Sequence, residues 1–181
     1  MRLIKTTNHA STNGSGSNIR VEELANYRLR LIKGFEEIGA EIENIAERLS
    51  AEKADLFQEG TGWNTRKIFL HIREVEMGYF LPYIKRILVG EKVELGVYEA
   101  AEKSGKDEKE GEQLQEIISD LIVSCRLLTT MLGEMSEKDW NRTGRHLQSG
   151  NHTVQWYLEQ NLAHLKAHIR QLVGYLDPAS V

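Results

Sequence analysis

Residues 31–49, LIKGFEEIGAEIENIAERL, decide the fold class because their apolar side chains recur at the spacing of one helix face. The apolar positions advance in alternating steps of four and three residues, through Leu31, Phe35, Ile38, Ile42, Ile45 and Leu49. This spacing produces the apolar stripe of a long amphipathic helix, which needs partner helices to bury it. The stretch therefore predicts a helical bundle.

A second helix is expected to begin directly after Asn64, whose short polar side chain suits the N-cap position. Its buried face is predicted by four residues at helical spacing: Ile68, Ile72, Val75 and Tyr79. Pro82 lacks a backbone N–H, so we expect it to kink this helix.

The third helix is predicted by apolar positions from Leu114 to Leu132, and the last helix runs from near Thr153 to Asp177. No convincing strand of period two appears in the sequence. Residues 99–113, of which nine are charged, form a long solvated link between the second and third helices. The pattern predicts an all-α fold, a four-helix bundle with this link.

Residues 1–18 are predicted to form a flexible N-terminal arm. Residues 6–18 contain eleven Ser, Thr, Asn or Gly residues among thirteen, too little apolar surface to offset the entropy of ordering the segment. Residues 19–181 are then expected to form a single bundle domain, a usual size for one hydrophobic core.

Composition excludes several classes of function. The formal charge of −4 gives no electrostatic reason to expect binding to nucleic acid or to an anionic membrane. One cysteine, Cys125, excludes an internal disulfide and fits a reducing compartment. No apolar run has the length of a signal peptide core or a membrane span. The expected location is the cytoplasm.

Three histidines are candidate metal ligands. His164 and His168 lie one helical turn apart, so two imidazoles on one face of the last helix can share a cation. His71 lies within the apolar face of the second helix, where an imidazole needs a partner for its nitrogens. Two interpretations remain open: the three rings meet across the bundle around a metal, or His71 is a hydrogen-bonded core residue and the pair is solvated.

Other polar residues fit ordinary structural roles better. His146 and His152 flank a loop before the last helix and are expected in solvent, although His146 could form the rim of a pocket. Cys125 lies on an apolar stripe, as a small buried thiol does. The Glu-x-x-His pairs of di-iron bundles are missing, which argues against a carboxylate-bridged pair of metals.

Two longer stretches resemble the DinB-like (YfiT-like) superfamily: residues 62–76, GWNTRKIFLHIREVE, and residues 145–172, RHLQSGNHTVQWYLEQNLAHLKAHIRQL. The resemblance implies a four-helix bundle in which His71, His164 and His168 bind a divalent metal ion, most often nickel or zinc. Two departures are visible. Leu165 stands where many relatives have Glu, and Asn64 replaces the commoner Ser.

The same resemblance implies candidate functions. Members include transferases that join low-molecular-weight thiols, such as bacillithiol or mycothiol, to electrophiles; others are called metal-dependent hydrolases, and many are homodimers. We therefore predict a thiol S-transferase whose partners are a small thiol, an electrophile and a second copy of the chain. The alternatives are a metal-dependent hydrolase and a non-catalytic dimeric stress-response or binding module. No general base or other catalytic residue is assigned.

Overall fold

The computed structural model describes residues 14–49, 63–96 and 112–176 and divides the chain into two compact units, residues 1–30 and 31–181. Helix α1, Gly14–Arg48, begins in the first unit and continues into the second. Residues 14–18, which belong to the predicted arm, are thus helical. Residues 1–13, residues 99–111 of the predicted link, and the Asp177-Pro178 end of the last helix lie outside the described residues.

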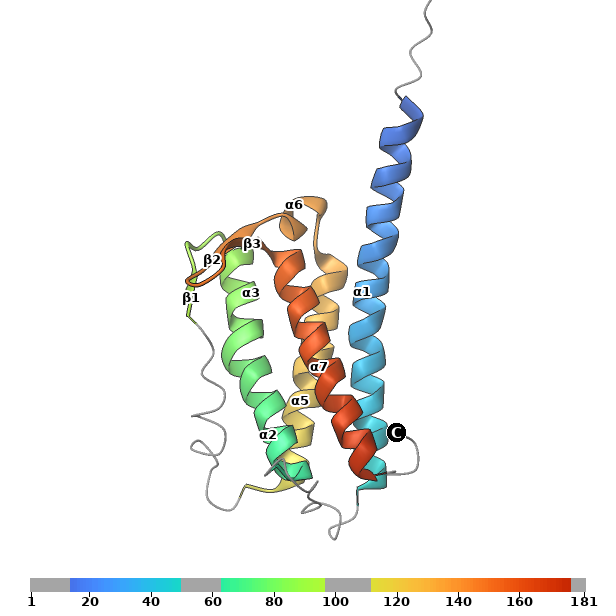
Figure 1. Cartoon of the computed structure of the whole chain (residues 1–181), viewed down its shortest axis with the longest axis vertical. Coiled ribbons are helices and arrows are strands. Elements are labelled where there is room, and N and C mark those ends of the chain that lie inside the picture. The colour runs from blue at the N-terminus through green and yellow to red at the C-terminus, as the bar shows by residue number, and fades with distance from the viewer. Residues whose placement is uncertain (1–13, 50–62, 97–111, 177–181) are drawn as a thin grey trace, which may run out of the picture. The chain divides into compact units, whose positions relative to one another are not determined.

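The second unit is a four-helix bundle, as predicted (Figure 1). Its other long elements are α2 (Thr65–Val75), which continues through η2 (Glu76–Phe80) into α3 (Leu81–Leu88), then α5 (Leu114–Glu134) and α7 (Val154–Leu176). Helix α2 packs against both α5 and α7. A short helix, α6 (Glu137–Trp140), connects α5 to the segment before α7.

The predicted stripe of α1 forms part of the core. Four of its residues, Phe35, Ile38, Ile42 and Ile45, are almost fully buried. Gly34 lets α1 approach α7 closely, because a Cβ atom at this position would lie 2.7 Å from a methyl carbon of Leu162. None of the described helices has an apolar stretch long enough to cross a membrane.

Helix α2 begins at the predicted cap. The Asn64 side-chain oxygen accepts a hydrogen bond of 2.8 Å from the Lys67 N–H, which satisfies one free donor of the first turn. The last helix begins similarly, with Thr153 Oγ1 accepting from the Trp156 N–H. These caps explain why both helix starts could be located from the sequence.

A π-helical turn, η2, lies just before Pro82, where the sequence predicts a kink. In η2 the Leu81 N–H donates to the carbonyl of Glu76, five residues earlier. The wider turn rotates the residues that follow Glu76, so Phe80 is buried while Tyr79 is only half-buried. The prediction that Tyr79 belongs to the buried face is confirmed only in part, because Tyr79 packs against the core but stays half-buried.

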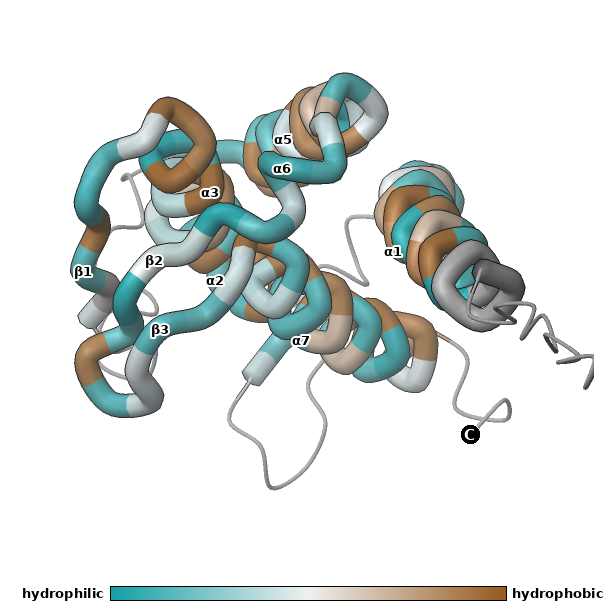
Figure 2. The backbone as a smooth tube through the Cα atoms, turned by 90° about the horizontal axis from the view of Figure 1, so that it is seen from above, coloured by the Kyte–Doolittle hydropathy of each residue, from teal (hydrophilic) through white to brown (hydrophobic). Residues whose placement is uncertain are grey.

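The sequence did not reveal a small sheet. Strands β1 (Glu94–Leu95), β2 (Thr143–His146) and β3 (Gly150–Thr153) pair in that order, β1 parallel and β3 antiparallel to β2. The β2–β3 turn ends at Gly150, whose φ of +91° favours glycine. The strands are short and β2 and β3 are largely hydrophilic (Figure 2), so they carry no period-two apolar signal.

Candidate metal centre

Three imidazoles from two helices meet in the second unit. His71 projects from α2, and His164 and His168 project from one face of α7. The Nε2 atoms of His71 and His164 lie 3.1 Å apart, and one ring nitrogen from each of the three residues lies within 4.8 Å of the others. The ring centroids are separated by 4.6–5.2 Å. The structure thus brings together the three histidines selected from the sequence.

The environment of the cluster keeps its rings uncharged. Burial, followed by the charge of His168, lowers the pKa of His71 from 6.5 to about 4. Burial, followed by the charges of His168 and His71, lowers the pKa of His164 to about 3. Burial also lowers the pKa of His168, against the opposing effect of a hydrogen bond with Gln171. Neutral imidazoles have a nitrogen lone pair available at neutral pH.

The donor set fits a divalent transition metal. Two nitrogens bound to one tetrahedral zinc ion at about 2.0–2.1 Å lie about 3.3 Å apart, which is close to the separation of the His71 and His164 Nε2 atoms. Among the residues that the structure describes, the Nδ1 atoms of these two rings have no hydrogen-bond partner. Three neutral ligands leave the charge of the ion uncompensated, and a tetrahedral ion keeps one position open for a small molecule.

Aromatic side chains surround the cluster. The Trp63 ring lies edge-on to His71, with centroids 5.0 Å apart, and nearly parallel to His168 at 6.2 Å. Phe80, which the π turn buries, lies 6.3 Å from His164. These rings restrict the orientations of the imidazoles and cover part of the cluster from solvent.

A hydrogen-bonded chain supports His168. Its Nδ1 lies 3.2 Å from Gln171 Oε1, Gln171 Nε2 donates to the Tyr175 hydroxyl at 2.9 Å, and that hydroxyl donates to the main-chain oxygen of Trp63 at 3.4 Å. The spacing of three and then four residues along α7 placed these side chains on the histidine face, but the sequence does not show how they connect.

A second buried polar group was missed from the sequence. Glu76 and Asn161 are almost completely buried, and burial raises the pKa of the Glu76 carboxyl to about 7 while Asn161 opposes the rise. Within the described part of the chain, neither Glu76 oxygen has a hydrogen bond of normal geometry. Glu76 lies seven residues after Phe69 and four after Ile72, both of them buried, so the helical spacing of α2 could have located it.

The other two histidines that the structure describes, His146 and His152, do not join the cluster. His146 lies at the end of β2, and its Nδ1 accepts from the Gln148 and Ser149 N–H groups of the hairpin turn. His152 lies 2.8 Å from the Ser149 hydroxyl and stacks on Trp156. Both are partly exposed strand residues, whereas the sequence predicts a loop here.

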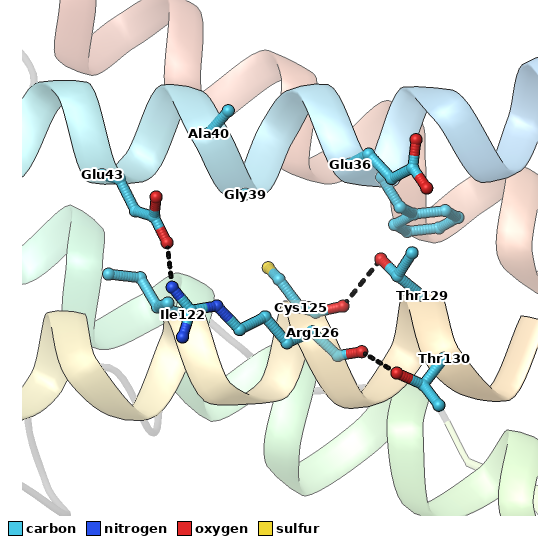
Figure 3. Close-up of a pocket in the computed structure, with 10 residues that line it drawn as sticks. Glu36, Gly39, Ala40, Glu43, Ile122, Cys125, Arg126, Thr129 and Thr130 are labelled. Atoms are coloured by element: carbon cyan, nitrogen blue, oxygen red, sulfur yellow. Dashed lines mark hydrogen bonds and ion pairs between the residues drawn. The ribbon is translucent and has the colours of Figure 1, made fainter.

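Cys125 lies in a separate pocket of about 580 Å³ between α1 and α5 (Figure 3). Arg126 and Glu43 form an ion pair across this pocket, 2.5 Å apart. Burial, and secondarily the charge of Glu76, raises the pKa of the Cys125 thiol to about 12, so the thiol stays protonated. This agrees with the interpretation of Cys125 as a small buried side chain, not a nucleophile.

Comparisons with known proteins agree with the fold. YfiT from Bacillus subtilis, described as a probable metal-dependent hydrolase with an unusual four-helix bundle topology, matches with a TM-score of 0.73 at 16% identity, over 98% of this chain and 93% of YfiT. The DinB-like protein YjoA, also from Bacillus subtilis, matches with a TM-score of 0.52 at 13% identity, over 84% of this chain and 93% of its own.

A search of functionally curated proteins found no match. The family model of the DinB superfamily matches residues 35–172, which include all three clustered histidines and most of the bundle. On this match, the chain belongs to the DinB superfamily.

Proposed function

We propose that His71, His164 and His168 bind one divalent metal ion, nickel or zinc, and that the protein is a metal-dependent enzyme that transfers a low-molecular-weight thiol to an electrophile. The observation that carries this proposal is the cluster itself: three neutral imidazoles without a carboxylate among them, in the part of the chain that the structure describes. Bound there, a divalent ion would lower the pKa of a thiol or water ligand.

The absence of a carboxylate from the cluster favours a thiol over water as the nucleophile. A thiol ionises at a pKa of about 8.5, whereas water ionises at about 15.7, so a thiol needs less help from a general base. In the transfer, the thiol proton leaves to solvent, a sulfur–carbon bond forms, and the leaving group departs with the bonding electron pair. The three imidazoles would hold the metal ion, and the ion would bind and orient the thiolate beside the electrophile.

Hydrolysis is the second candidate, because YfiT is described as a probable metal-dependent hydrolase. The same three histidines would then hold a metal ion that lowers the pKa of a nucleophilic water. Paired assays separate the two reactions: loss of an electrophile that depends on added thiol supports transfer, whereas turnover without thiol supports hydrolysis. The probes are a mixture of small thiols with a halogenated aromatic electrophile, and a panel of activated esters and amides.

The third candidate is a binding module in which any metal is structural. It predicts that the ion has no exchangeable ligand position. Cobalt-substituted protein distinguishes this case, because a change in the visible spectrum on adding a small thiol requires an open position. An unchanged spectrum, together with no turnover in either assay, would contradict the enzyme proposal.

A further inference from the structure

We propose that the main-chain carbonyl of Trp63 sets the tautomer of His168, acting through Tyr175 and Gln171, so that His168 Nε2 carries the lone pair for a metal ion. The assignment of the tautomer needs no metal. The role of the chain of hydrogen bonds in metal affinity rests on the proposed function. We call this chain, from Trp63 O through Tyr175 and Gln171 to His168 Nδ1, the Trp63 relay.

The Trp63 carbonyl fixes the direction of the hydrogen bonds in the relay, because it can take only one role. A carbonyl oxygen can only accept, so the contact of 3.4 Å between Trp63 O and the Tyr175 hydroxyl requires Tyr175 to donate its one proton. The Tyr175 oxygen then keeps only lone pairs. It must therefore accept from whatever atom of Gln171 lies 2.9 Å away, which makes that atom the amide nitrogen.

The next two steps follow from the shape of the amide. Because Gln171 directs its nitrogen to Tyr175, it presents its oxygen, Oε1, to the imidazole of His168 at 3.2 Å. An oxygen acceptor needs a donor opposite it, so His168 Nδ1 carries the proton in the neutral ring. In a neutral imidazole the other nitrogen, Nε2, is then unprotonated and can bind a cation.

If the hydrogen bonds of the Trp63 relay ran in the opposite direction, His168 Nε2 could not bind a metal ion. If Tyr175 donated to Gln171, the amide would turn its nitrogen toward His168. His168 Nδ1 would then accept, the proton would lie on Nε2, and the ring would offer no lone pair to the cluster. The Tyr175 hydroxyl near the end of α7 and the Trp63 carbonyl before α2 therefore decide whether His168 Nε2 can bind a metal ion.

Trp63 also has a second contact with the same ligand. Its ring is nearly parallel to His168, at an interplanar angle of 16°, while its carbonyl ends the relay. The residue precedes the N-cap of α2, the helix that carries His71. The relay thus connects the start of one ligand-bearing helix to the end of the other.

The test is a double-mutant cycle in metal affinity, measured on the full chain by competition for zinc with a chromophoric chelator. Tyr175→Phe removes the directing hydroxyl and is expected to weaken zinc binding about 10- to 100-fold, the usual effect of losing the partner of a ligand. Gln171→Glu presents only acceptors to His168, so it fixes the Nδ1–H tautomer without Tyr175. In the Gln171→Glu background, Tyr175→Phe should change affinity less than about 2-fold.

Tyr157→Phe is the matched control. Tyr157 lies on the same helix and donates to the Gly144 carbonyl at 3.2 Å, but it has no link to His168. Its loss should leave zinc affinity unchanged. Equal weakening by Tyr175→Phe in the wild-type background and in the Gln171→Glu background, or no weakening in either, would overturn the relay.

The tautomer is measured directly by long-range ¹H–¹⁵N NMR of metal-free protein at pH 8, with the His168 signals assigned from His168→Ala. The expected spectrum shows Nδ1 protonated in the wild type and a shift toward Nε2 protonation in Tyr175→Phe. Nε2 protonation in the wild type would contradict the proposal. If wild-type protein binds no zinc, the proposed function fails, while this spectrum still decides the tautomer.

Discussion

Two groups of histidines in this protein have the same side chain and opposite surroundings. His71, His164 and His168 lie between α2 and α7, where burial lowers their pKa values and leaves neutral nitrogens facing one another. His146 and His152 lie on the β2–β3 hairpin, partly exposed, and contact polar groups of their own turn. The comparison shows that a metal site depends on burial and convergence from separate elements, not on the number of histidines.

The largest expected effect is the loss of bound metal from the buried group alone. His164→Ala should reduce zinc or nickel content from near-stoichiometric to background, because two remaining imidazoles hold a divalent ion poorly. His152→Ala, a histidine variant of the hairpin, should keep the full content. Elemental analysis of untagged protein purified without chelator measures both. Equal metal content in His164→Ala and His152→Ala would contradict the assignment of the metal site to the buried histidines.

The second effect is a loss of stability in acid. His71 and His164 have folded pKa values of about 4 and 3, below the ordinary 6.5, so the unfolded chain binds their protons more tightly. The stability that they contribute is therefore complete above pH 6.5 and falls as pH drops toward 3, by up to about 1.4 kcal/mol per pH unit for each ring. Urea unfolding of metal-free protein between pH 6.5 and 4 should show a shallower slope for His164→Gln than for wild type.

Glu76 should have the opposite pH dependence. Its folded pKa of about 7 lies above the ordinary 4.5, so the folded chain binds this proton more tightly and stability falls as pH rises from 4.5 to 7. Glu76→Gln should raise the free energy of unfolding at pH 8 by about 1–3 kcal/mol and change it little at pH 4. A destabilised Gln variant at pH 8 would show that the ionised carboxylate is well solvated or paired.

The smallest effect concerns the helix start that supports the buried group. Asn64→Ala removes the acceptor of the Lys67 N–H and should lower the free energy of unfolding by about 1 kcal/mol. Asn64→Ser restores an acceptor and should recover most of that loss. Zinc affinity should change less in Asn64→Ala than in Tyr175→Phe, because the cap does not contact a histidine ring. Thermal unfolding of wild type, Asn64→Ala and Asn64→Ser checks the order of stability, and competition with a chromophoric chelator checks the zinc affinities.

Much of the fold was predictable because the bundle rests on regular patterns. The stripe from Leu31 to Ile45, the cap at Asn64 and the start of α7 after Thr153 all occur where helical spacing and capping chemistry place them. The π turn was not predictable in this way. It changes the register after Glu76, so that Phe80 is buried and Tyr79 only half-buried, and the apolar period before it gives no sign of the change.

The candidate site was predictable in its members but not in its connections. The His164–His168 pair has helical spacing, and His71 interrupts an apolar face, so both features were visible in the sequence. Their convergence depends on how α2 packs against α7. The relay through Gln171 and Tyr175 depends further on the placement of Trp63, which comes from a different part of the chain.

Anomalous diffraction from crystals grown with zinc tests the central claim most directly. The account predicts one strong peak at the zinc edge, about 2.0–2.1 Å from a nitrogen of each of His71, His164 and His168. The peak should be missing in crystals of His168→Ala grown in the same way. A well-ordered triad without a peak, or zinc bound at the hairpin histidines instead, would contradict the assignment of this cluster as the metal centre.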